Sequence, residues 1–381
     1  MSPAIQHLYI HVPFCKGFCS YCPFYRERFS PASVKQWIAA LEREMQMLSA
    51  VYPFALQTIY MGGGTPSVLT PEDIARLSKA LHANFPMLES LEWTIEANPE
   101  SIDAAKVAAW HTAGATRVSL GVQSLENDTL QRMNRLHNGA MVQQTIAILQ
   151  TFPEISYGID LIAGFPGVSD CAWQKTLEGV LAFCPAHISV YECTLHSHTA
   201  LRMQISKGDI SESSLETRNR ALRVAAQRLK ATGFKHYETS NFCQPGFRCQ
   251  HNVAVWRGQD YVGLGPSASS RVGTKRWTSA PDLLAYVQAA PSGEFPRQTD
   301  DLTPEQDCTE RCMFAFRLCD PVSLDEFMPV DPKLASRMRT HWESQLTALH
   351  KEGLVCKQKQ GWCTTAKGKQ MVDYIAESLL P

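Results

Sequence analysis

Three cysteines stand close together near the start of the chain, Cys15, Cys19 and Cys22, in the stretch YIHVPFCKGFCSYCPF. Iron–sulfur clusters are held by cysteine thiolates. Because prolines and a glycine interrupt the stretch, we predict a loop, and a short loop can fold three thiolates around one cluster. The C-x3-C-x2-C spacing would hold three corners of a [4Fe–4S] cube and leave the fourth iron open to a small ligand.

Two simpler interpretations of the cysteines are a structural zinc site and a set of unligated thiols. A structural zinc site needs four ligands and usually shows two paired CxxC motifs, whereas this region has one compact triplet. The thiols could also be buried and unligated. The three-thiolate cluster is favoured, and the spacing resembles the signature of the radical S-adenosylmethionine (SAM) superfamily. That resemblance implies that the open iron chelates the amino and carboxylate groups of SAM.

Composition predicts an ordinary globular protein of the cytoplasm. The chain has 381 residues, with 44% hydrophobic content and a net charge of −1, which gives no basic field for nucleic acid. It lacks both the apolar run of a transmembrane helix and the pattern of a signal peptide. Its 13 cysteines are an odd number, more typical of reduced cytosolic thiols than of a disulfide framework.

Strand-like and helix-like segments alternate from the cysteine loop to about residue 193. A helix capped by Ser30 is followed by the strand LQTIYM, the turn GGGTP and a helix capped by Thr70. The same alternation continues through four further strands, which predicts βαβ units and a parallel sheet. We expect an α/β fold, an incomplete (β/α)6 barrel rather than a doubly wound sheet, with its active site at the C-terminal ends of the strands.

Polar side chains and glycines fall at those strand ends. Glu96, Gln123 and Asp160 each lie at or near the end of a predicted strand, where polar residues line sites more often than cores. The GGGT run at 62–65 lets the backbone approach a ligand, whose carboxylate its successive amides could bind, although a tight turn explains it equally well. Arg135 could either enter the site or merely complement a helix dipole.

Beyond residue 196 the chain has a different character. We expect a mobile crossover at 197–209, a long helix, and then a functional loop region at 235–270 that carries His251. A lone histidine is usually a structural residue. The run 290–306 reads as a linker. From about 302, helices and a hairpin resemble a winged-helix module, which we interpret as a lid or structural domain because its charge is too thin for DNA binding.

With these residues in view, nearly the whole chain resembles the radical SAM branch that contains anaerobic coproporphyrinogen III oxidase (HemN) and the haem chaperone HemW. The likeness rests on YxHxPFC at 9–15, GGGTP at 62–66, EANP at 96–99, GVQS at 121–124, DLIxGFP at 160–166 and YETS at 237–240. It implies a radical SAM partial barrel over 1–290 and a C-terminal helical, winged-helix-like domain over 302–381. The implied ligands of the [4Fe–4S] cluster are Cys15, Cys19 and Cys22. The implied SAM site comprises Tyr9, Tyr21, Gly63, Gly64, Thr65, Glu96, Gln123, Arg135 and Asp160.

Two details favour the chaperone type within this branch. HemN-type oxidases carry a further cysteine two residues after the triplet, where this chain has Phe24, and they have a longer N-terminal extension. HemW-type proteins carry an HNxxYW haem motif, which here reads His251-Asn252-Val253-Ala254-Val255-Trp256, so valine replaces the tyrosine. The resemblance thus implies haem binding by His251, Asn252 and Trp256.

We therefore expect a haem chaperone that delivers haem to an acceptor haemoprotein and takes electrons from a donor. The alternative is a radical SAM enzyme acting on a porphyrin. Its reaction would be the oxidative decarboxylation of coproporphyrinogen III or the opening of the haem ring.

Overall fold

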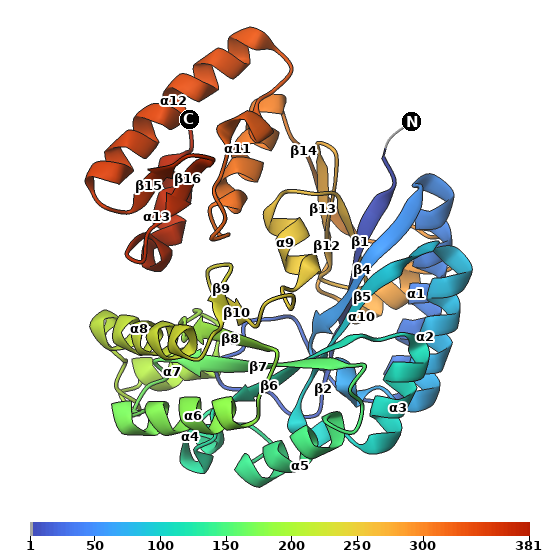
Figure 1. Ribbon diagram of the computed structural model, residues 1–381. Helices are drawn as coiled ribbons and strands as arrows, with labels where there is room; N and C mark the ends of the chain where they lie inside the picture. Colours follow the sequence, from blue (N-terminus) through green and yellow to red (C-terminus); the bar gives the residue numbers. More distant parts are fainter. Residues whose placement is uncertain (1–2) are drawn as a thin grey trace.

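Six parallel strands form the centre of the computed structural model, which describes residues 3–381 (Figure 1). They stand in the order β1-β4-β5-β6-β7-β8, with every neighbouring pair parallel. Helices between successive strands cover the outside (Figure 1), as βαβ crossovers require. The strands are β1 (Ile5–Val12), β4 (Phe54–Gly63), β5 (Met87–Ala97), β6 (Arg117–Gln123), β7 (Ser156–Ala163) and β8 (His187–Glu192). The expected incomplete (β/α)6 barrel is confirmed.

The barrel is incomplete because β1 and β8 pair with further strands and not with each other. Beyond β1 the order is β11-β12-β13-β14, and beyond β8 it is β10-β9. Strand β11 is parallel to β1, whereas β10 is antiparallel to β8. These strands are β9 (Lys235–His236), β10 (Asn241–Cys243), β11 (Tyr261–Leu264), β12 (Ser269–Val272), β13 (Lys275–Ser279) and β14 (Arg297–Asp301).

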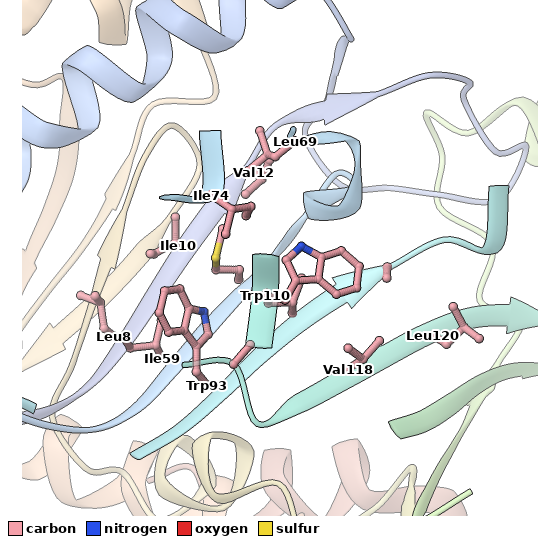
Figure 2. Close-up of a cluster of buried hydrophobic side chains, with 14 of the residues drawn as sticks. Leu8, Ile10, Val12, Ile59, Leu69, Ile74, Trp93, Trp110, Val118 and Leu120 are labelled. Atoms are coloured by element: carbon pink, nitrogen blue, oxygen red, sulfur yellow. The ribbon is translucent and has the colours of Figure 1, made fainter. Parts of the chain in front are cut away.

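Alternation along the strands separates an apolar outer layer from a polar interior. In β1, Leu8, Ile10 and Val12 are fully buried and belong to the main core, which Figure 2 shows together with Trp110 of α3. The alternate residues of the strand, His7, Tyr9 and His11, face the opposite side because the side chains of a strand alternate. The same alternation places polar side chains of β4, β5 and β6 inside the barrel.

The helix ends follow local sequence signals. Thr70 and Asp73 form a reciprocal capping box at the start of α2, and Pro71 occupies its first turn. Ser30 occupies the N-cap position of α1 but makes no capping hydrogen bond with its side chain. The helices around the barrel are α1 (Pro31–Val51), α2 (Pro71–Asn84), α3 (Ala104–Ala113), α4 (Asn127–Arg132), α5 (Gly139–Leu149), α6 (Asp170–Ala182), α7 (Ala200–Ser206), α8 (Leu215–Ala231), α9 (Gln250–Trp256) and α10 (Leu283–Ala289).

Three expectations for the second half were wrong. The crossover at 197–209 contains the helix α7, capped by Thr199, whose side chain accepts from the amide of Arg202. The region expected to be loop contains α9 and short strands. The expected linker contains β14, which pairs antiparallel with β13. These segments are short, and tertiary contacts decide their structure more than propensity does.

The last part of the chain packs around its own apolar centre, which includes Phe316, Trp342 and Leu346. It joins the barrel through the backbone of Thr239, whose amide donates to the carbonyl of Arg317. Its elements are α11 (Pro304–Ala315), α12 (Pro332–Lys351), the hairpin β15 (Val355–Gln358) and β16 (Gly361–Thr364), and α13 (Val372–Ser378). The division of the chain at 290 and 302 stays a prediction. No helix within residues 3–381 is both long and apolar enough to cross a membrane.

Candidate functional site

A cavity of about 390 Å³ lies at the C-terminal ends of the parallel strands, the end predicted for the site. All three cysteines of the N-terminal triplet line it. Eight of the nine residues expected to bind SAM line it as well: Tyr21, Gly63, Gly64, Thr65, Glu96, Gln123, Arg135 and Asp160. The exception is Tyr9, which lies in β1 with its hydroxyl 3.1 Å from Nδ1 of His11 and stacks on Tyr60.

The cysteine loop is anchored at both ends. Cys15 ends the two-residue strand β2 (Phe14–Cys15), which pairs with β3 (Glu27–Arg28). Its Sγ lies 3.3 Å from Oγ1 of Thr65, and burial raises the pKa of its thiol to about 11. Within residues 3–381 no three His, Cys, Asp or Glu side chains converge as ligands of a single metal ion would. The three thiols instead line one cavity side by side.

Arg135 joins this loop to the strand ends. Its guanidinium donates to Oδ1 of Asn98 and to the carbonyl of Gly121, both at 2.6 Å, and to Sγ of Cys19 at 3.3 Å. Arg135 lies beyond α4, which ends at Arg132. Its contacts are therefore with the cavity wall, and the helix-dipole interpretation is not needed.

The glycine turn after β4 packs closely against the cysteine loop, and its backbone amides bond within the protein. The amides of Gly64 and Thr65 donate to the carbonyls of Val12 and Phe14, each at 2.8 Å, and that of Gly63 donates to Oε2 of Glu96 at 3.2 Å. The expectation that successive amides bind a ligand carboxylate was therefore wrong, because the turn closes onto the cysteine loop. A Cβ on Gly64 would lie 2.7 Å from the carbonyl oxygen of Val12, so the position requires glycine.

Two carboxyl groups stand in the wall of the cavity. Tyr60 donates its hydroxyl to Oε1 of Glu96 at 2.8 Å, and burial raises the pKa of Glu96 to about 7. Ser119 donates to both oxygens of Asp160 at 2.9 and 3.1 Å, and burial also raises the pKa of Asp160. A cation bound here would favour the ionised forms of both groups.

The end of β6 carries a strained backbone. Gln123 has φ 66°, in the left-handed region that non-glycine residues rarely occupy. The β6–β7 register shifts between Gly121 and Gln123, and this irregularity puts the Gln123 side chain in the cavity wall. Such strain is characteristic of functional sites.

Several lining residues were missed by sequence reasoning. They include Asn98, Ser119, Tyr191 and His196. Period-2 alternation could have found Ser119, because its register partner in β5 is Glu96. Asn98 follows Glu96 in the same EANP motif and donates to Oγ1 of Thr65 at 3.2 Å.

The three residues expected to bind haem lie elsewhere, on α9. His251 is 5% exposed, and its Nδ1 lies 2.8 Å from Oγ1 of Thr58. Glu92 of β5 accepts from the backbone amide of His251 at 3.2 Å. Trp256 donates its indole N–H to Glu238 at 2.9 Å. None of the three expected haem residues lines the cysteine cavity.

Strand register gives the separation of these two groups. Thr58, beside His251, pairs with His7 and Glu92, whereas Gly62, near the cavity, pairs with His11. Four residues along a strand span roughly 13 Å. The cysteine cavity and the ring of His251 therefore lie toward opposite ends of the parallel strands, with Tyr60 between them.

Comparison with known proteins agrees with this architecture. Residues 9–180 match the radical SAM superfamily and residues 302–371 match the HemN C-terminal domain. A protein of Mycobacterium tuberculosis named haem chaperone HemW is 30% identical over 98% of this chain and 94% of its own length. The chain belongs to the radical SAM superfamily.

Further likenesses place this radical SAM protein in the HemN/HemW branch. Haem chaperone HemW of Bacillus subtilis is 28% identical over 96% of both chains. The structure of coproporphyrinogen III oxidase (HemN) from Escherichia coli superimposes with a TM-score of 0.85 over 99% of this chain and 90% of that one, at 23% identity. This structural likeness shows the shared fold.

The residues of the cavity fit the two groups that the radical SAM superfamily uses. Cys15, Cys19 and Cys22 would hold a [4Fe–4S] cluster, which supplies one electron to SAM when both are bound. Arg135 fixes the wall beside Cys19, and Glu96 and Asp160 would offer carboxyl groups to the cationic parts of SAM. The closed glycine turn would let the ligand approach the backbone.

Proposed function

We propose that this protein binds haem at His251 and delivers it to acceptor haemoproteins, while its cysteine cavity holds a [4Fe–4S] cluster and SAM. The observation that carries the proposal is the full-length likeness to proteins named haem chaperone HemW. Three of the four defining residues of their haem motif, His251, Asn252 and Trp256, are present on α9.

The surroundings of His251 support a role as a ligand. Haem iron is bound by neutral imidazole, and burial lowers the pKa of His251 to about 3, so the ring is neutral at physiological pH. Its Nδ1 is engaged by Thr58, while no residue within 3–381 hydrogen-bonds its Nε2. Metal-bound histidines commonly use one ring nitrogen for the metal and the other for a fixed hydrogen bond.

Access to His251 requires movement of α9 or of the module above it. The residue is almost fully covered, and α9 lies between the barrel and the C-terminal module (Figure 1). Asp320 of that module accepts from Arg248 at 2.7 Å and lies 3.5 Å from Arg257. Because Arg248 precedes α9 and Arg257 follows it, Asp320 holds both ends of the helix, and we call these three residues the bracket. Arg317 stacks 4.8 Å from the Trp256 ring. Opening of this bracket would let an iron porphyrin in.

Replacement of the proposed ligand tests the function. His251→Ala should abolish the Soret band that the wild-type chain gives with added haem, because the axial nitrogen is removed. His82→Ala, a change at an exposed histidine on α2, is the matched control and should leave the band intact. An unchanged Soret band in His251→Ala would contradict the assignment.

A second measurement separates delivery from porphyrin chemistry. Anaerobically reconstituted protein is incubated with SAM, a reductant and either haem or coproporphyrinogen III. The proposal expects haem to be bound unaltered and transferred to an apo-haemoprotein. Decarboxylated or ring-opened tetrapyrrole, formed together with 5′-deoxyadenosine, would make the chain an enzyme instead.

A further inference from the structure

A chain of hydrogen bonds leads from His251 on α9 through the barrel strands to Gln259, which follows α9 in the sequence. Nδ1 of His251 lies 2.8 Å from Oγ1 of Thr58, and the same oxygen lies 3.0 Å from Nδ1 of His7. Nε2 of His7 lies 2.7 Å from Oε1 of Gln259. Thr58, His7 and His251 are each at most 5% exposed, so water does not compete freely for the two bonds of Thr58, whereas Gln259 is an exposed residue.

The chemistry of the four groups gives this chain a direction. Oε1 of Gln259 can only accept, so Nε2 of His7 carries the proton. His7 is 3% exposed and its ring nitrogens contact the uncharged side chains of Thr58 and Gln259, which offer no charge to offset the cost of a buried cation. The ring is therefore neutral, which leaves Nδ1 of His7 as an acceptor. The single hydroxyl proton of Thr58 is then donated to His7.

The same reasoning settles the state of His251. With its proton committed to His7, the Thr58 oxygen can only accept, so Nδ1 of His251 must donate to it. A neutral imidazole with its proton on Nδ1 has its lone pair on Nε2. That nitrogen is the one without a partner within residues 3–381.

We propose that Gln259, His7 and Thr58 are positioning residues that fix His251 in the Nδ1–H tautomer and so present Nε2 to an incoming metal. We call these three residues the relay, and each has a distinct role. Gln259 accepts from Nε2 of His7, Nδ1 of His7 accepts from the Thr58 hydroxyl, and the Thr58 oxygen accepts from Nδ1 of His251. The role of Nε2 as a haem ligand rests on the proposed function, whereas the tautomer itself does not.

The tautomer is measured directly in the metal-free full-length chain. Selective ¹⁵N-histidine labelling distinguishes a protonated ring nitrogen from a bare one. The chain has 12 histidines, and the His251 signals are assigned by their loss in His251→Gln. We expect a protonated Nδ1 and a bare Nε2. A protonated Nε2 in the wild-type chain would overturn the inference.

Four variants test the individual links. Thr58→Val keeps the shape but removes the hydroxyl, and it should mix the two tautomers, whereas Thr58→Ser should restore the wild-type pattern. Thr94→Val is the matched control, because Thr94 is a buried threonine of the neighbouring strand whose hydroxyl has no hydrogen-bond partner among residues 3–381. A carboxylate at position 259 would favour the charged form of His7, so the informative change there is Gln259→Leu, which removes the acceptor and should mix the two tautomers. An unchanged pattern in Thr58→Val or in Gln259→Leu would refute the relay.

Haem titration of the same variants separates this inference from the proposed function. Thr58→Val should weaken haem binding by about tenfold, the lower end for loss of a residue that orients a metal-bound histidine, while Thr94→Val should not. Equal haem affinity in the two valine variants would overturn the presentation of Nε2 to the metal. A wild-type chain with the expected tautomer and no haem binding would refute the haem ligand and leave the tautomer relay standing.

Discussion

Replacement of Arg135 by glutamine should destabilise the metal-free protein and loosen the cluster loop at once. The guanidinium makes two bonds of 2.6 Å, to Asn98 and to the Gly121 carbonyl, and one of 3.3 Å to Sγ of Cys19. Hydrogen bonds from a charged group contribute about 1.5–3 kcal/mol each. Glutamine can replace one of the two short bonds, and it removes the desolvation cost of burying the guanidinium charge, which offsets part of the loss. We therefore expect a loss of about 3 kcal/mol of unfolding free energy.

Urea unfolding of the metal-free chain measures this loss. Arg135→Lys keeps the charge but not the planar fork, so it should lose about half as much. Arg220→Gln is the control, because Arg220 pairs with Asp170 on the exposed surface, where such pairs contribute little. A loss below about 1 kcal/mol in Arg135→Gln would refute the view that this residue ties the loop to the strand ends. Iron content after anaerobic reconstitution should fall in parallel, because Cys19 loses its partner.

Three further predictions concern the same cavity. Cys19→Ala should abolish the brown chromophore after anaerobic reconstitution, and wild-type levels of iron and sulfide would contradict the cluster assignment. Gly64→Ala should cost about 1–3 kcal/mol in urea unfolding, because its Cβ would meet the backbone of residues 12 and 14; stability equal to wild type would show that the turn can relax. The pKa of Glu96 is about 7 in the folded chain against an ordinary 4.5, so the folded state holds the proton more tightly than the unfolded state does. The free energy of unfolding should therefore fall by roughly 3 kcal/mol as pH rises from about 4.5 to about 7. Glu96→Gln should remove this part of the pH dependence but leave that of Glu238, whose pKa burial also raises to about 7; an unaltered pH profile would contradict the shifted pKa.

The sequence predicted the barrel and most of the cavity because both depend on local, periodic signals. The strand–helix alternation gave the fold class, and the strand ends pointed to Glu96, Gln123 and Asp160, which do line the cavity. Tyr9 does not line the cavity, and its position in β1 alone does not determine which neighbour its hydroxyl contacts. The glycine turn was correctly located but misread, since only the folded chain shows its amides donating to residues 12 and 14.

The second half was harder to predict because its elements are short and long-range contacts decide them. Strand β14 pairs with β13 across some twenty residues of sequence, and α9 is held by Glu92 of β5. No local pattern around His251 shows that its ring lies beside Thr58, 193 residues away along the chain. The relay that we infer depends entirely on such contacts.

The same two strands, β4 and β5, supply side chains to both proposed sites. Strand β4 supplies Thr58 to the haem end, Tyr60 to the middle, and the turn from Gly62 onward to the cavity; β5 supplies Glu92 and Glu96 in the same order. A slip of one residue in either strand would turn all of these side chains outward together. The strands therefore cannot shift to admit or release a ligand at one end without destroying the other. Under the proposed function, the motion that admits haem would come from α9 and the segment around Asp320, which lie outside the parallel strands. Asp320 holds Arg248 and Arg257 through side-chain contacts, and the neighbouring amide of Cys319 adds one backbone bond to the carbonyl of Tyr237.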